Sequence, residues 1–338
     1  MAGPDPAVAA VRLAVRRCLS EVTSEGPVVV ACSGGADSLA LVAASVFECR
    51  RSGRPVVGAT VDHGLQEGSA RHADHVVGQM AALGVSETLT ARVHVEATGQ
   101  GPEAAAREAR YAVLEEVARR SGSSVVLLGH TLDDQAETVL LGLTRGSGGR
   151  SIAGMRRVIP GSAGDPARLS FHRPLLDLTR AQTEQACRAQ DLDFWSDPHN
   201  DDARFTRSRV RHRVLPVLEE ELGPGVAVTL ARTADLLRED MELLDRLADE
   251  ALARARTSHS GLDAPWLRTQ PLALSTRVLR RAAVEAGAPP AELAKGHVDA
   301  LVRLMRGAHA SGRAAQLQLP GHVTAYLDEG RVLRFRRT

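Results

Sequence analysis

Apolar and polar positions along the first half of the chain alternate in a way that predicts strands and helices in turn. Short apolar runs that end in polar clusters predict buried strands, and the longer stretches between them predict helices. The predicted strands are Val28–Cys32, Val56–Val61, Thr88–Val95 and Val125–Leu128. The predicted helices are Leu39–Arg50, Ser69–Leu83 and Glu103–Arg120. This order is typical of an α/β fold, a Rossmann-like doubly wound parallel sheet with helices on both faces.

The pattern changes after Pro216. The segment from Val226 to Arg256 has few helix breakers and a stripe of leucines, which predicts one long helix. The stripe consists of Leu230, Leu236, Leu237, Leu243, Leu244 and Leu247. Two helices and three strands are expected beyond it, at Leu274–Ala286, Ala291–Arg306, Gln316–Leu319, Val323–Leu327 and Val332–Phe335. We therefore predict an α/β domain at 1–216, a linker helix at 217–256, and an appended, mainly helical second domain with a β extension at 257–338.

Length and composition are those of a globular protein of two or three domains. Of the 338 residues 43% are apolar and 25% charged, and the net charge of +1 does not by itself predict a nucleic-acid partner. The N-terminus has no signal pattern, and no apolar run nears the roughly 18 residues that span a bilayer. We therefore expect a cytoplasmic protein with no membrane partner. The four cysteines lack the spacing of a metal site, and Cys32 is expected to be a core residue rather than a nucleophile.

Polar clusters follow three of the predicted strands. They are Ser33–Ser38, Asp62–Leu65 and Gly129–Asp134. In a parallel sheet the carboxyl ends of the strands lie along one edge, where ligands collect. The sequence therefore predicts an active site where these three clusters meet.

The first cluster, Ser33-Gly34-Gly35-Ala36-Asp37-Ser38, lies between a predicted strand and a predicted helix. Its glycines let the backbone approach a ligand closely, and its free N–H groups, together with the positive end of the helix dipole, favour an anion. A phosphate is the expected ligand, with the two serines as hydroxyl donors and Asp37 available to hold a magnesium ion beside a polyphosphate. No lysine follows the glycines, so this is not the Walker A pattern. The alternative is an ordinary glycine-rich turn with serines that cap the helix.

The third cluster continues into a predicted helix. Thr131 and Asp134 form a capping pair at its start, and Asp134 and Glu137, three residues apart, share one face. His130 and Asp133 lie at the entrance of this helix. The helix dipole would account for the two aspartates, but not for Glu137 and His130 on the same side. We therefore interpret Asp134 and Glu137 as functional residues, in addition to the loop at Ser33–Ser38.

These segments resemble a known family. Ser33 to Ser38 resembles the SGGxDS loop of the N-type ATP pyrophosphatases (the PP-loop superfamily), which cleave ATP to AMP and pyrophosphate. Leu127 to Thr138 is similar to the L-L-G-H-T-x-D-D-Q-x-E-T motif of one branch, the bacterial tRNA(Ile)-lysidine synthases. Further similar segments are Val61–Leu65, Ala109–Tyr111, Leu143–Met155, Arg173–Leu176 with Arg180 and Glu184, Asp197–Asn200 and Phe205–Arg211. The resemblance covers residues 27–216, with mild departures at His199, where the family has Ser, and at Ser208, where it has Asn.

The resemblance implies an enzyme that joins free L-lysine to C2 of the wobble cytidine of isoleucine tRNA with a CAU anticodon. ATP would first adenylate the C2 oxygen, which is otherwise a poor leaving group, and the lysine side-chain amine would then displace AMP. ATP is therefore the expected co-substrate and Mg²⁺ the expected metal. The nucleotide would lie against Ser33, Gly34, Gly35, Ala36, Asp37 and Ser38, with Asp37 as the metal ligand.

The other catalytic roles implied by the resemblance fall on the matched motifs. Asp134 and Glu137 would hold the ammonium groups of lysine, and one of the two would accept a proton as the amine attacks. The sequence does not indicate which of them is the base. His130 and Asp133 would support that site or the metal. Arg209 would neutralise charge on the adenylated intermediate, because a guanidinium suits phosphate oxygens.

Four arginines are expected to contact the tRNA. They are Arg145, Arg150, Arg207 and Arg211. The run Arg204–Arg213 has the alternative interpretation of a solvated helix face, and Gly146–Gly149 that of a flexible connector. The resemblance implies that the second domain holds the tRNA body, and we expect the chain to lack the further domain of the longest family members.

Other functions are weighed against this one. A tRNA thiolase with the same ATP chemistry would usually need paired cysteines, which the sequence does not contain. NAD, GMP and asparagine synthetases share the loop but not the second motif. A module that only binds ATP or RNA would leave Asp134 and Glu137 without a role. The oligomeric state is left open, with a homodimer as one of the alternatives.

Overall fold

The computed structural model describes residues 3–62, 69–92, 102–146, 148–162, 169–195, 202–257, 261–307 and 316–338. The chain divides into two compact units, one formed by Met1–Leu141 with Gly154–Arg232 and the other by Gly142–Ala153 with Thr233–Thr338. The second unit thus includes a short segment from within the first half of the chain. The main division falls after Arg232, inside the long helix, whereas the sequence-based division placed boundaries at 216 and 256.

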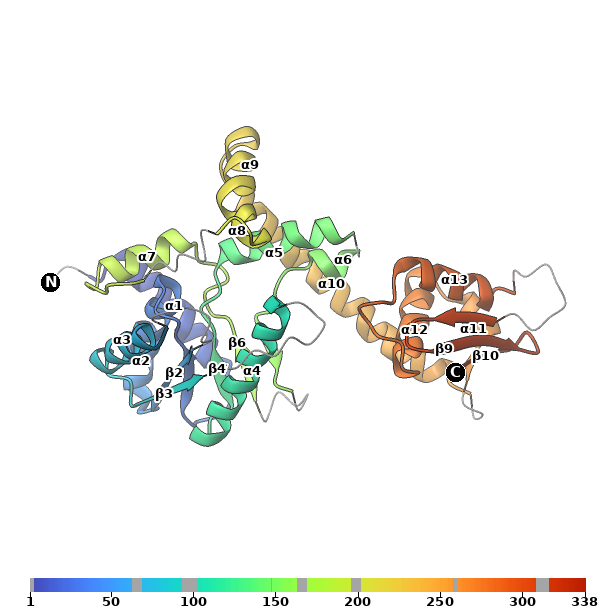
Figure 1. Cartoon of the computed structure of the whole chain (residues 1–338), viewed down its shortest axis with the longest axis horizontal. Helices are drawn as coiled ribbons and strands as arrows, with labels where there is room; N and C mark the ends of the chain where they lie inside the picture. Colours follow the sequence, from blue (N-terminus) through green and yellow to red (C-terminus); the bar gives the residue numbers. More distant parts are fainter. Residues whose placement is uncertain are drawn as a thin grey trace. The chain divides into compact units, whose positions relative to one another are not determined.

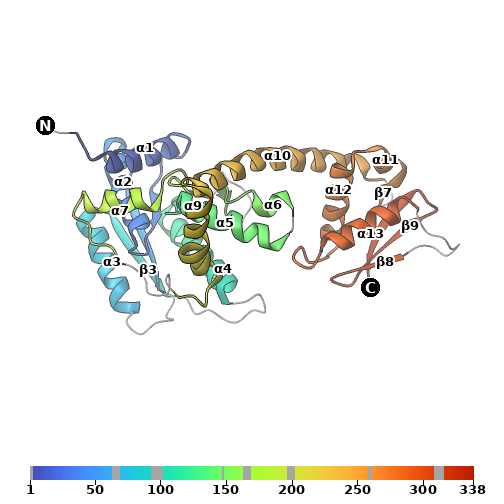
Figure 2. The ribbon, with the colours of Figure 1, turned by 90° about the horizontal axis from the view of Figure 1, so that it is seen from above.

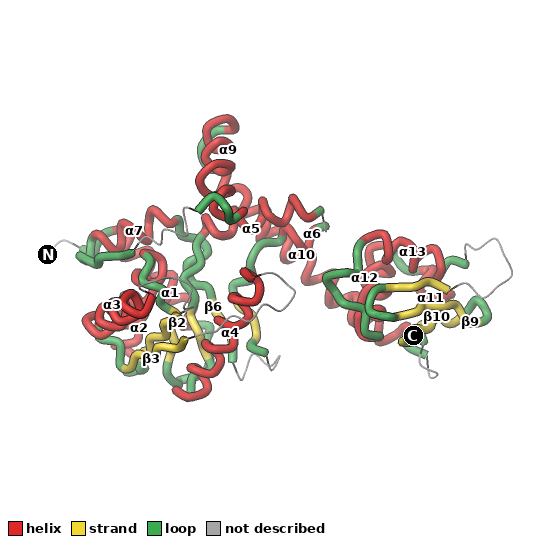
Figure 3. The backbone as a smooth tube through the Cα atoms, viewed as in Figure 1, coloured by secondary structure: helices red, strands yellow, loops and turns green. Residues whose placement is uncertain are grey.

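A six-stranded sheet with the order β3-β2-β1-β4-β6-β5 forms the centre of the first unit (Figures 1 and 3). Its strands are β1 (Val28–Ala31), β2 (Val56–Asp62), β3 (Glu87–Arg92), β4 (Val125–Leu127), β5 (Val158–Pro160) and β6 (Ser170–His172). All neighbouring pairs run parallel except β5 and β6, which are antiparallel. The four predicted strands and the parallel sheet are confirmed. β5 and β6 were not predicted, because three residues are too few to show a period.

Helices cover both faces of this sheet, as predicted. The elements of this unit are α1 (Pro6–Ser20), α2 (Ala36–Ser52), α3 (Ser69–Leu83), α4 (Pro102–Ser121), the first part of α5 (Leu132–Arg145), α7 (Arg180–Arg188), α8 (Thr206–Arg209), the π-helix η2 (Val210–Val214) and α9 (Leu215–Leu222). Val28 and Val30 of β1 pack with α1, α2, α3 and α7 in one core, and Val29 packs with α4 in the other. This alternation is what a strand buried on both faces requires.

Helix α1 was not predicted, although its start carries a clear signal. The Asp5 side chain accepts a hydrogen bond from Ala7 N–H at 2.8 Å, and Pro6 is the first helical residue. An aspartate cap followed by proline is a favourable beginning of a helix.

The second unit combines helices with an antiparallel sheet of order β7-β10-β9-β8. Its elements are α6 (Gly149–Ile152), most of α10 (Val226–Ala255), β7 (Leu262–Asp263), α11 (Ala264–Thr269), α12 (Leu272–Glu285), α13 (Lys295–Met305), β8 (Gln316–Leu319), β9 (Val323–Asp328) and β10 (Val332–Arg337). Figure 2 shows α10 as one continuous helix, and the predicted helices and strands of this region are confirmed.

The packing of α10 differs from what its leucine stripe suggested. Ala234 and Ala248 are fully buried, whereas Leu236 is 62% exposed and Leu243 is also exposed. The buried positions of α10 are therefore mostly alanines, together with Leu252. Within the described part of the chain, no helix is both long and apolar enough to cross a membrane.

Candidate active site

The glycine-rich loop joins β1 to α2 at the carboxyl edge of the sheet. β1 ends at Ala31 and α2 begins at Ala36. Gly34 has a φ of 83°, and a Cβ there would lie 2.6 Å from Val76 Cγ2, so the position requires glycine. Gly35, the N-cap of α2, gives no side-chain hydrogen bond to the first turn. The first N–H groups of α2 are thus left for an anionic ligand, as at other phosphate-binding helix starts.

The serines of the loop hold its shape. Ser38 Oγ accepts a hydrogen bond from Ser33 N–H at 3.1 Å and donates one to the Gly35 carbonyl at 2.9 Å. Cys32, next to them, is 3% exposed, and burial raises the pKa of its thiol. Cys32 therefore lies in the core, where the sequence placed it.

Gly129 lets the segment after β4 approach the first turn of α2. A Cβ at Gly129 would lie 3.1 Å from both Ser38 N and the carbonyl carbon of Asp37, and these backbone atoms cannot move aside as a side chain can. We expect Gly129→Ala to lower the free energy of unfolding by about 1–3 kcal/mol and to weaken nucleotide binding. Urea denaturation measures the first effect. The control is Gly78→Ala in α3, where a Cβ meets nothing within 4 Å and should be neutral or stabilising. Equal stability of the two variants would contradict the close approach.

Asp37 lies in the first turn of α2 with its side chain 20% exposed. One carboxylate oxygen accepts a hydrogen bond from Thr183 Oγ1, and the other lies 3.5 Å from Arg180 Nε. Burial raises the pKa of Asp37 to about 6, although Arg180 and Thr183 act in the opposite direction. A further cation beside Asp37 would offset this cost of burial.

Two arginines bind the fully buried Glu137 of α5. Its carboxylate accepts hydrogen bonds from Arg207 Nε at 2.7 Å and from Arg211 Nε at 2.6 Å. Arg207 belongs to α8 and Arg211 to η2, and the two are four residues apart. This spacing places both guanidinium groups on one side of the helix.

Asp134 shares this cluster. Its Oδ2 accepts a hydrogen bond from Thr131 N–H at 2.9 Å, which confirms the predicted capping pair. Its Oδ1 lies 3.3 Å from Nη2 of both Arg180 and Arg211. Burial alone would raise the pKa of Asp134, but Arg207 and Arg180 outweigh it and hold that pKa below its usual value.

Arg180, the first residue of α7, joins the two sequence motifs into one site. Its guanidinium lies 3.5 Å from Asp37, 3.3 Å from Asp134 and 3.8 Å from Glu137, and its backbone N–H donates to Asp133 at 2.8 Å. The carboxylates of Asp37, Asp134 and Glu137 are thus matched by three guanidinium groups. The predicted convergence of the first and third clusters is confirmed by these contacts.

Further cations surround His130. Burial lowers the pKa of His130 to about 3; Asp134 opposes this, whereas Arg173 and Arg110 contribute to it. Burial, together with repulsion from Arg107, Arg207 and Arg173, also lowers the pKa of the Arg110 guanidinium. Among the residues that the structure describes, the buried Nδ1 of His130 has no hydrogen-bond partner. Several positive charges near a buried, unsatisfied polar atom favour an anionic or polar ligand at this position.

The other predicted arginines lie in different surroundings. Arg209 donates hydrogen bonds to the carbonyls of Ala203 and Arg204 and to Thr206 Oγ1 at 2.7–3.0 Å, so its side chain supports its own loop. Arg145 is exposed in the last turn of α5. Arg150 belongs to the second unit, where its guanidinium bonds both oxygens of Asp245 at 2.7 and 2.8 Å. The predicted segments 63–65 and 197–200 lie outside the described residues.

Comparison with known proteins decides the family. The profile of the PP-loop domain family matches residues 10–218. The tRNA(Ile)-lysidine synthase of Streptomyces coelicolor is 46% identical to this chain, over 98% of the chain and 99% of the relative. Those of Thermobifida fusca and Salinispora arenicola are 48% and 49% identical, over 98% of this chain and 99% and 97% of theirs. The chain belongs to the tRNA(Ile)-lysidine synthase family. The resemblance found in the sequence is thereby confirmed.

A solved structure shares the fold of this lysidine synthase family member. The U34-tRNA thiolase NcsA from Methanococcus maripaludis, solved with its [4Fe-4S] cluster, is similar with a TM-score of 0.56. The likeness covers 69% of this chain and 79% of that chain at 17% identity. At this identity the likeness concerns the α/β fold alone.

The residues of this lysidine synthase family member fit a magnesium ion that arrives with a nucleotide. Mg²⁺ typically takes one or two protein carboxylates and fills its other positions with phosphate oxygens and water. Within the described ranges, no group of three or more His, Cys, Asp or Glu side chains is placed to hold a metal. Asp37, beside the loop and with a pKa raised by burial, is a suitable single carboxylate ligand.

Sequence reasoning did not assign roles to several residues of the cluster. Arg180 and Arg110 entered only as matched positions, and Thr183 and α7 were not predicted. One signal was available: Thr179 and Gln182 form a capping box, which marks the start of α7 and places Arg180 in its first turn. The packing of α7 against α2 could not be read from that signal.

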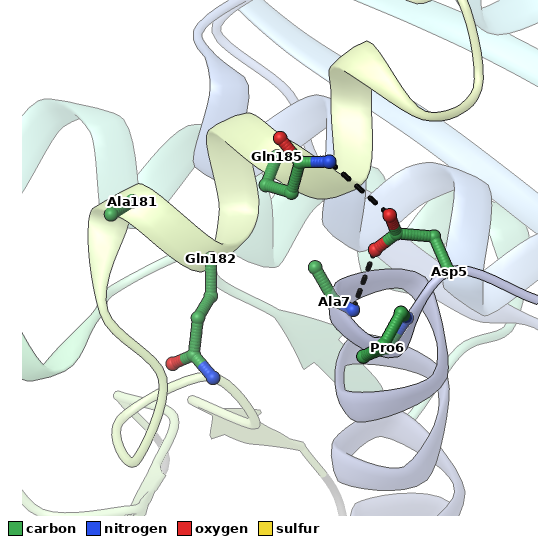
Figure 4. Close-up of a pocket in the computed structure, with 6 residues that line it drawn as sticks. All are labelled: Asp5, Pro6, Ala7, Ala181, Gln182 and Gln185. Atoms are coloured by element: carbon green, nitrogen blue, oxygen red, sulfur yellow. Dashed lines mark hydrogen bonds between the residues drawn. The ribbon is translucent and has the colours of Figure 1, made fainter.

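A cavity of about 420 Å³ lies between the starts of α1 and α7, apart from the motif residues (Figure 4). It is lined by Asp5, Pro6, Ala7, Ala181, Gln182 and Gln185. The Asp5 carboxylate accepts hydrogen bonds from Ala7 N–H at 2.8 Å and Gln185 Nε2 at 3.2 Å, so its oxygens already serve the structure. We assign no function to this cavity.

Proposed function

We propose that this chain is an ATP-dependent ligase that converts the wobble cytidine of isoleucine tRNA with a CAU anticodon to lysidine. Its other substrates are ATP and free L-lysine, and its cofactor is Mg²⁺. AMP and pyrophosphate are its by-products. The observation that carries the proposal is Arg180, which lies within 3.5 Å of both Asp37 and Asp134 and so links the phosphate loop to the acidic pair. Family membership over nearly the whole chain supports the substrate. We place the reaction in the cytoplasm.

In the first step the C2 oxygen of the cytidine attacks the α-phosphorus of ATP, and pyrophosphate leaves. The amides of the loop and of the first turn of α2 bind the phosphates. Asp37 would hold Mg²⁺, which when bound would supply charge neutralisation at the phosphate oxygens. The guanidinium of Arg180 lies beside Asp37, and those of Arg207 and Arg211 bond Glu137. These groups suit the developing phosphate charge better than Arg209, whose side chain bonds its own loop.

In the second step the lysine side-chain amine attacks C2, and AMP leaves with the former C2 oxygen. Asp134 and Glu137 bind the ammonium groups, which requires that Arg207 and Arg211 turn partly from these carboxylates towards the phosphate. Arg180 also lowers the pKa of Asp134 and still faces it when Arg207 turns away, so we assign Asp134 to ammonium binding. Glu137 is then the group that accepts the proton lost by the ε-ammonium before the amine attacks. His130, neutral because its pKa is lowered to about 3, offers hydrogen bonds to the substrate. The partly buried Arg110 is suited to an anionic group of a substrate.

Contacts with the rest of the tRNA are assigned to arginines outside this cluster. Arg145, in the last turn of α5, and Arg150, in α6, both belong to the segment Gly142–Ala153 of the second unit. Their exposed guanidinium groups suit phosphates of an RNA backbone.

The test is ATP-dependent incorporation of radiolabelled lysine into purified isoleucine tRNA with a CAU anticodon. Methionine tRNA with the same anticodon is the control, since it shares the wobble base and differs elsewhere. We expect incorporation into the first tRNA only. A folded protein that binds ATP without incorporating lysine would argue instead for another PP-loop function, a thiolase or a binding module.

A further inference from the structure

We propose that His72 and Trp195 are positioning residues that hold the phosphate loop in its anion-binding shape. His72 Nε2 lies 2.9 Å from the Ser33 carbonyl oxygen, and Trp195 N–H donates to the Gly34 carbonyl at 3.0 Å. A carbonyl oxygen only accepts hydrogen bonds, so His72 must carry a proton on Nε2. Two consecutive carbonyls of the loop are therefore fixed from outside the loop. The proposal rests on the loop being the ATP site.

Because the peptide bond is planar, fixing these two carbonyls also fixes the direction of the N–H groups that would bind the ligand. In a trans peptide the C=O and the following N–H point in opposite directions, and the described residues contain no cis peptide. Fixing the Ser33 and Gly34 carbonyls on one side therefore directs the N–H groups of Gly34 and Gly35 to the other. Those N–H groups continue into the first turn of α2, where a phosphate would bind.

The two clamping residues also hold each other. Their rings are 4.0 Å apart between centroids and tilted by 38°. His72 is further fixed against Gly34, because a Cβ at Gly34 would lie 2.8 Å from His72 Cε1. The clamp, defined as His72 and Trp195, thus joins α3 and the segment after α7 to the loop. The motif residues alone do not reveal it, since His72 and Trp195 are 39 and 161 positions away from the contacted Ser33 and Gly34.

The clamp contacts belong to the nucleotide loop, so its loss should weaken ATP binding without affecting lysine binding. Two substitutions of His72 distinguish its hydrogen bond to Ser33 from its ring contact with Trp195. His72→Phe keeps a ring against Trp195 but removes the donor to Ser33, whereas His72→Gln keeps a donor of similar reach. His75→Phe, at an exposed position of the same helix, is the matched control.

The experiment measures dissociation constants for ATP and for inorganic pyrophosphate by titration calorimetry, together with KM values for ATP and lysine. We expect His72→Phe to raise the dissociation constants of ATP and pyrophosphate about 3- to 10-fold, as for the loss of one hydrogen bond. His72→Gln should recover most of the affinity, His75→Phe should match the wild type, and the KM for lysine should not change. Trp195→Ala removes the ring that packs on His72 but keeps the backbone N–H that donates to Gly34, and it should also weaken ATP binding. This variant takes the place of His72→Phe if His72→Phe does not fold.

Unchanged ATP affinity in His72→Phe and Trp195→Ala would overturn the clamp, as would equal changes in the KM values for ATP and lysine. The calorimetric dissociation constants need no tRNA, so they are independent of lysine transfer, whereas the KM values require it. If the wild-type protein bound ATP but transferred no lysine, the proposed function would fail while the clamp could still be measured. If the wild-type protein bound neither ATP nor pyrophosphate, both proposals would fall.

Discussion

Glu137→Ala is expected to reduce lysine transfer about 100-fold or more while adenylation of the tRNA remains measurable. Glu137 is fully buried, and it lies with Asp134 at the proposed ammonium site rather than at the phosphate loop. The substitution would also remove the nearer carboxylate of Arg207 and Arg211, while Asp134 would remain 3.5 Å and 3.3 Å from them. Because these arginines are 31% and 21% exposed, water can solvate part of their charge. We expect a loss of about 1–3 kcal/mol in the free energy of unfolding, below the full cost of breaking a buried pair.

The two steps can be separated in one assay series. Pyrophosphate release with tRNA and ATP reports adenylation, and radiolabelled lysine reports transfer. Glu137→Gln keeps the shape and an acceptor but loses the charge, so it tests the carboxylate alone. Glu184→Gln is the control, because Glu184 forms a half-exposed ion pair with Arg188 in α7. Equal loss of both steps in Glu137→Gln, with the fold intact, would show that Glu137 serves adenylation and would remove its assignment to lysine.

Asp37→Asn should reduce pyrophosphate release about 100- to 1,000-fold, because it removes the negative charge that we propose to hold Mg²⁺ beside the loop. The substitution preserves shape and keeps an oxygen that can accept from Thr183. Its effect should therefore fall on the reaction rather than on folding. Direct titration of Mg²⁺ with ATP onto wild type and variant provides a readout apart from activity. A variant with unchanged pyrophosphate release would exclude Asp37 as the metal ligand.

The raised pKa of Asp37 also predicts how pH acts. The pKa is about 6 in the folded protein against an ordinary value of 3.8, so the folded state binds a proton more readily than the unfolded chain. Asp37 therefore contributes stability at low pH that is lost as the pH rises through about 6. Activity should move the opposite way, with kcat/KM for ATP rising through the same range as the carboxylate ionises. Both dependences should vanish in Asp37→Asn, and saturating Mg²⁺ with ATP should shift the midpoint of kcat below that of kcat/KM.

Local patterns were sufficient to predict much of the fold and the principal motifs. The central strands β1 to β4, helices α2 to α4 and the terminal strands follow from apolar runs and their breakers. The loop at Ser33–Ser38 was identifiable because glycine placement and its position between strand and helix are local properties. The capping pair Thr131–Asp134 was identifiable for the same reason.

Contacts between distant segments could not be predicted in this way. The sequence showed an arginine-rich run at Arg204–Arg213, but not that Arg207 and Arg211 face Glu137 while Arg209 bonds its own loop. Which arginines share a face depends on the turn of α8 and η2 and on where those helices pack. Arg180 could be placed only when α7 was known to lie against the start of α2. Charge balance in the cluster is a tertiary property, whereas the sequence indicated only that Asp134 and Glu137 share one helix face.

The segment Gly142–Ala153 makes the second unit discontinuous in the chain. Its Arg150 bonds Asp245, and the Ala153 carbonyl accepts two hydrogen bonds from the Arg238 guanidinium at 2.9 and 3.1 Å. A fragment that begins at Thr233 would lack these partners, leaving Arg238 with its ion pair to Asp235 and Asp245 with longer ones to Arg277 and Arg281. The C-terminal region would therefore lose these contacts if gene fusion appended it alone to another catalytic domain. Its exchange between proteins would keep these hydrogen bonds if residues 142–153 moved with it.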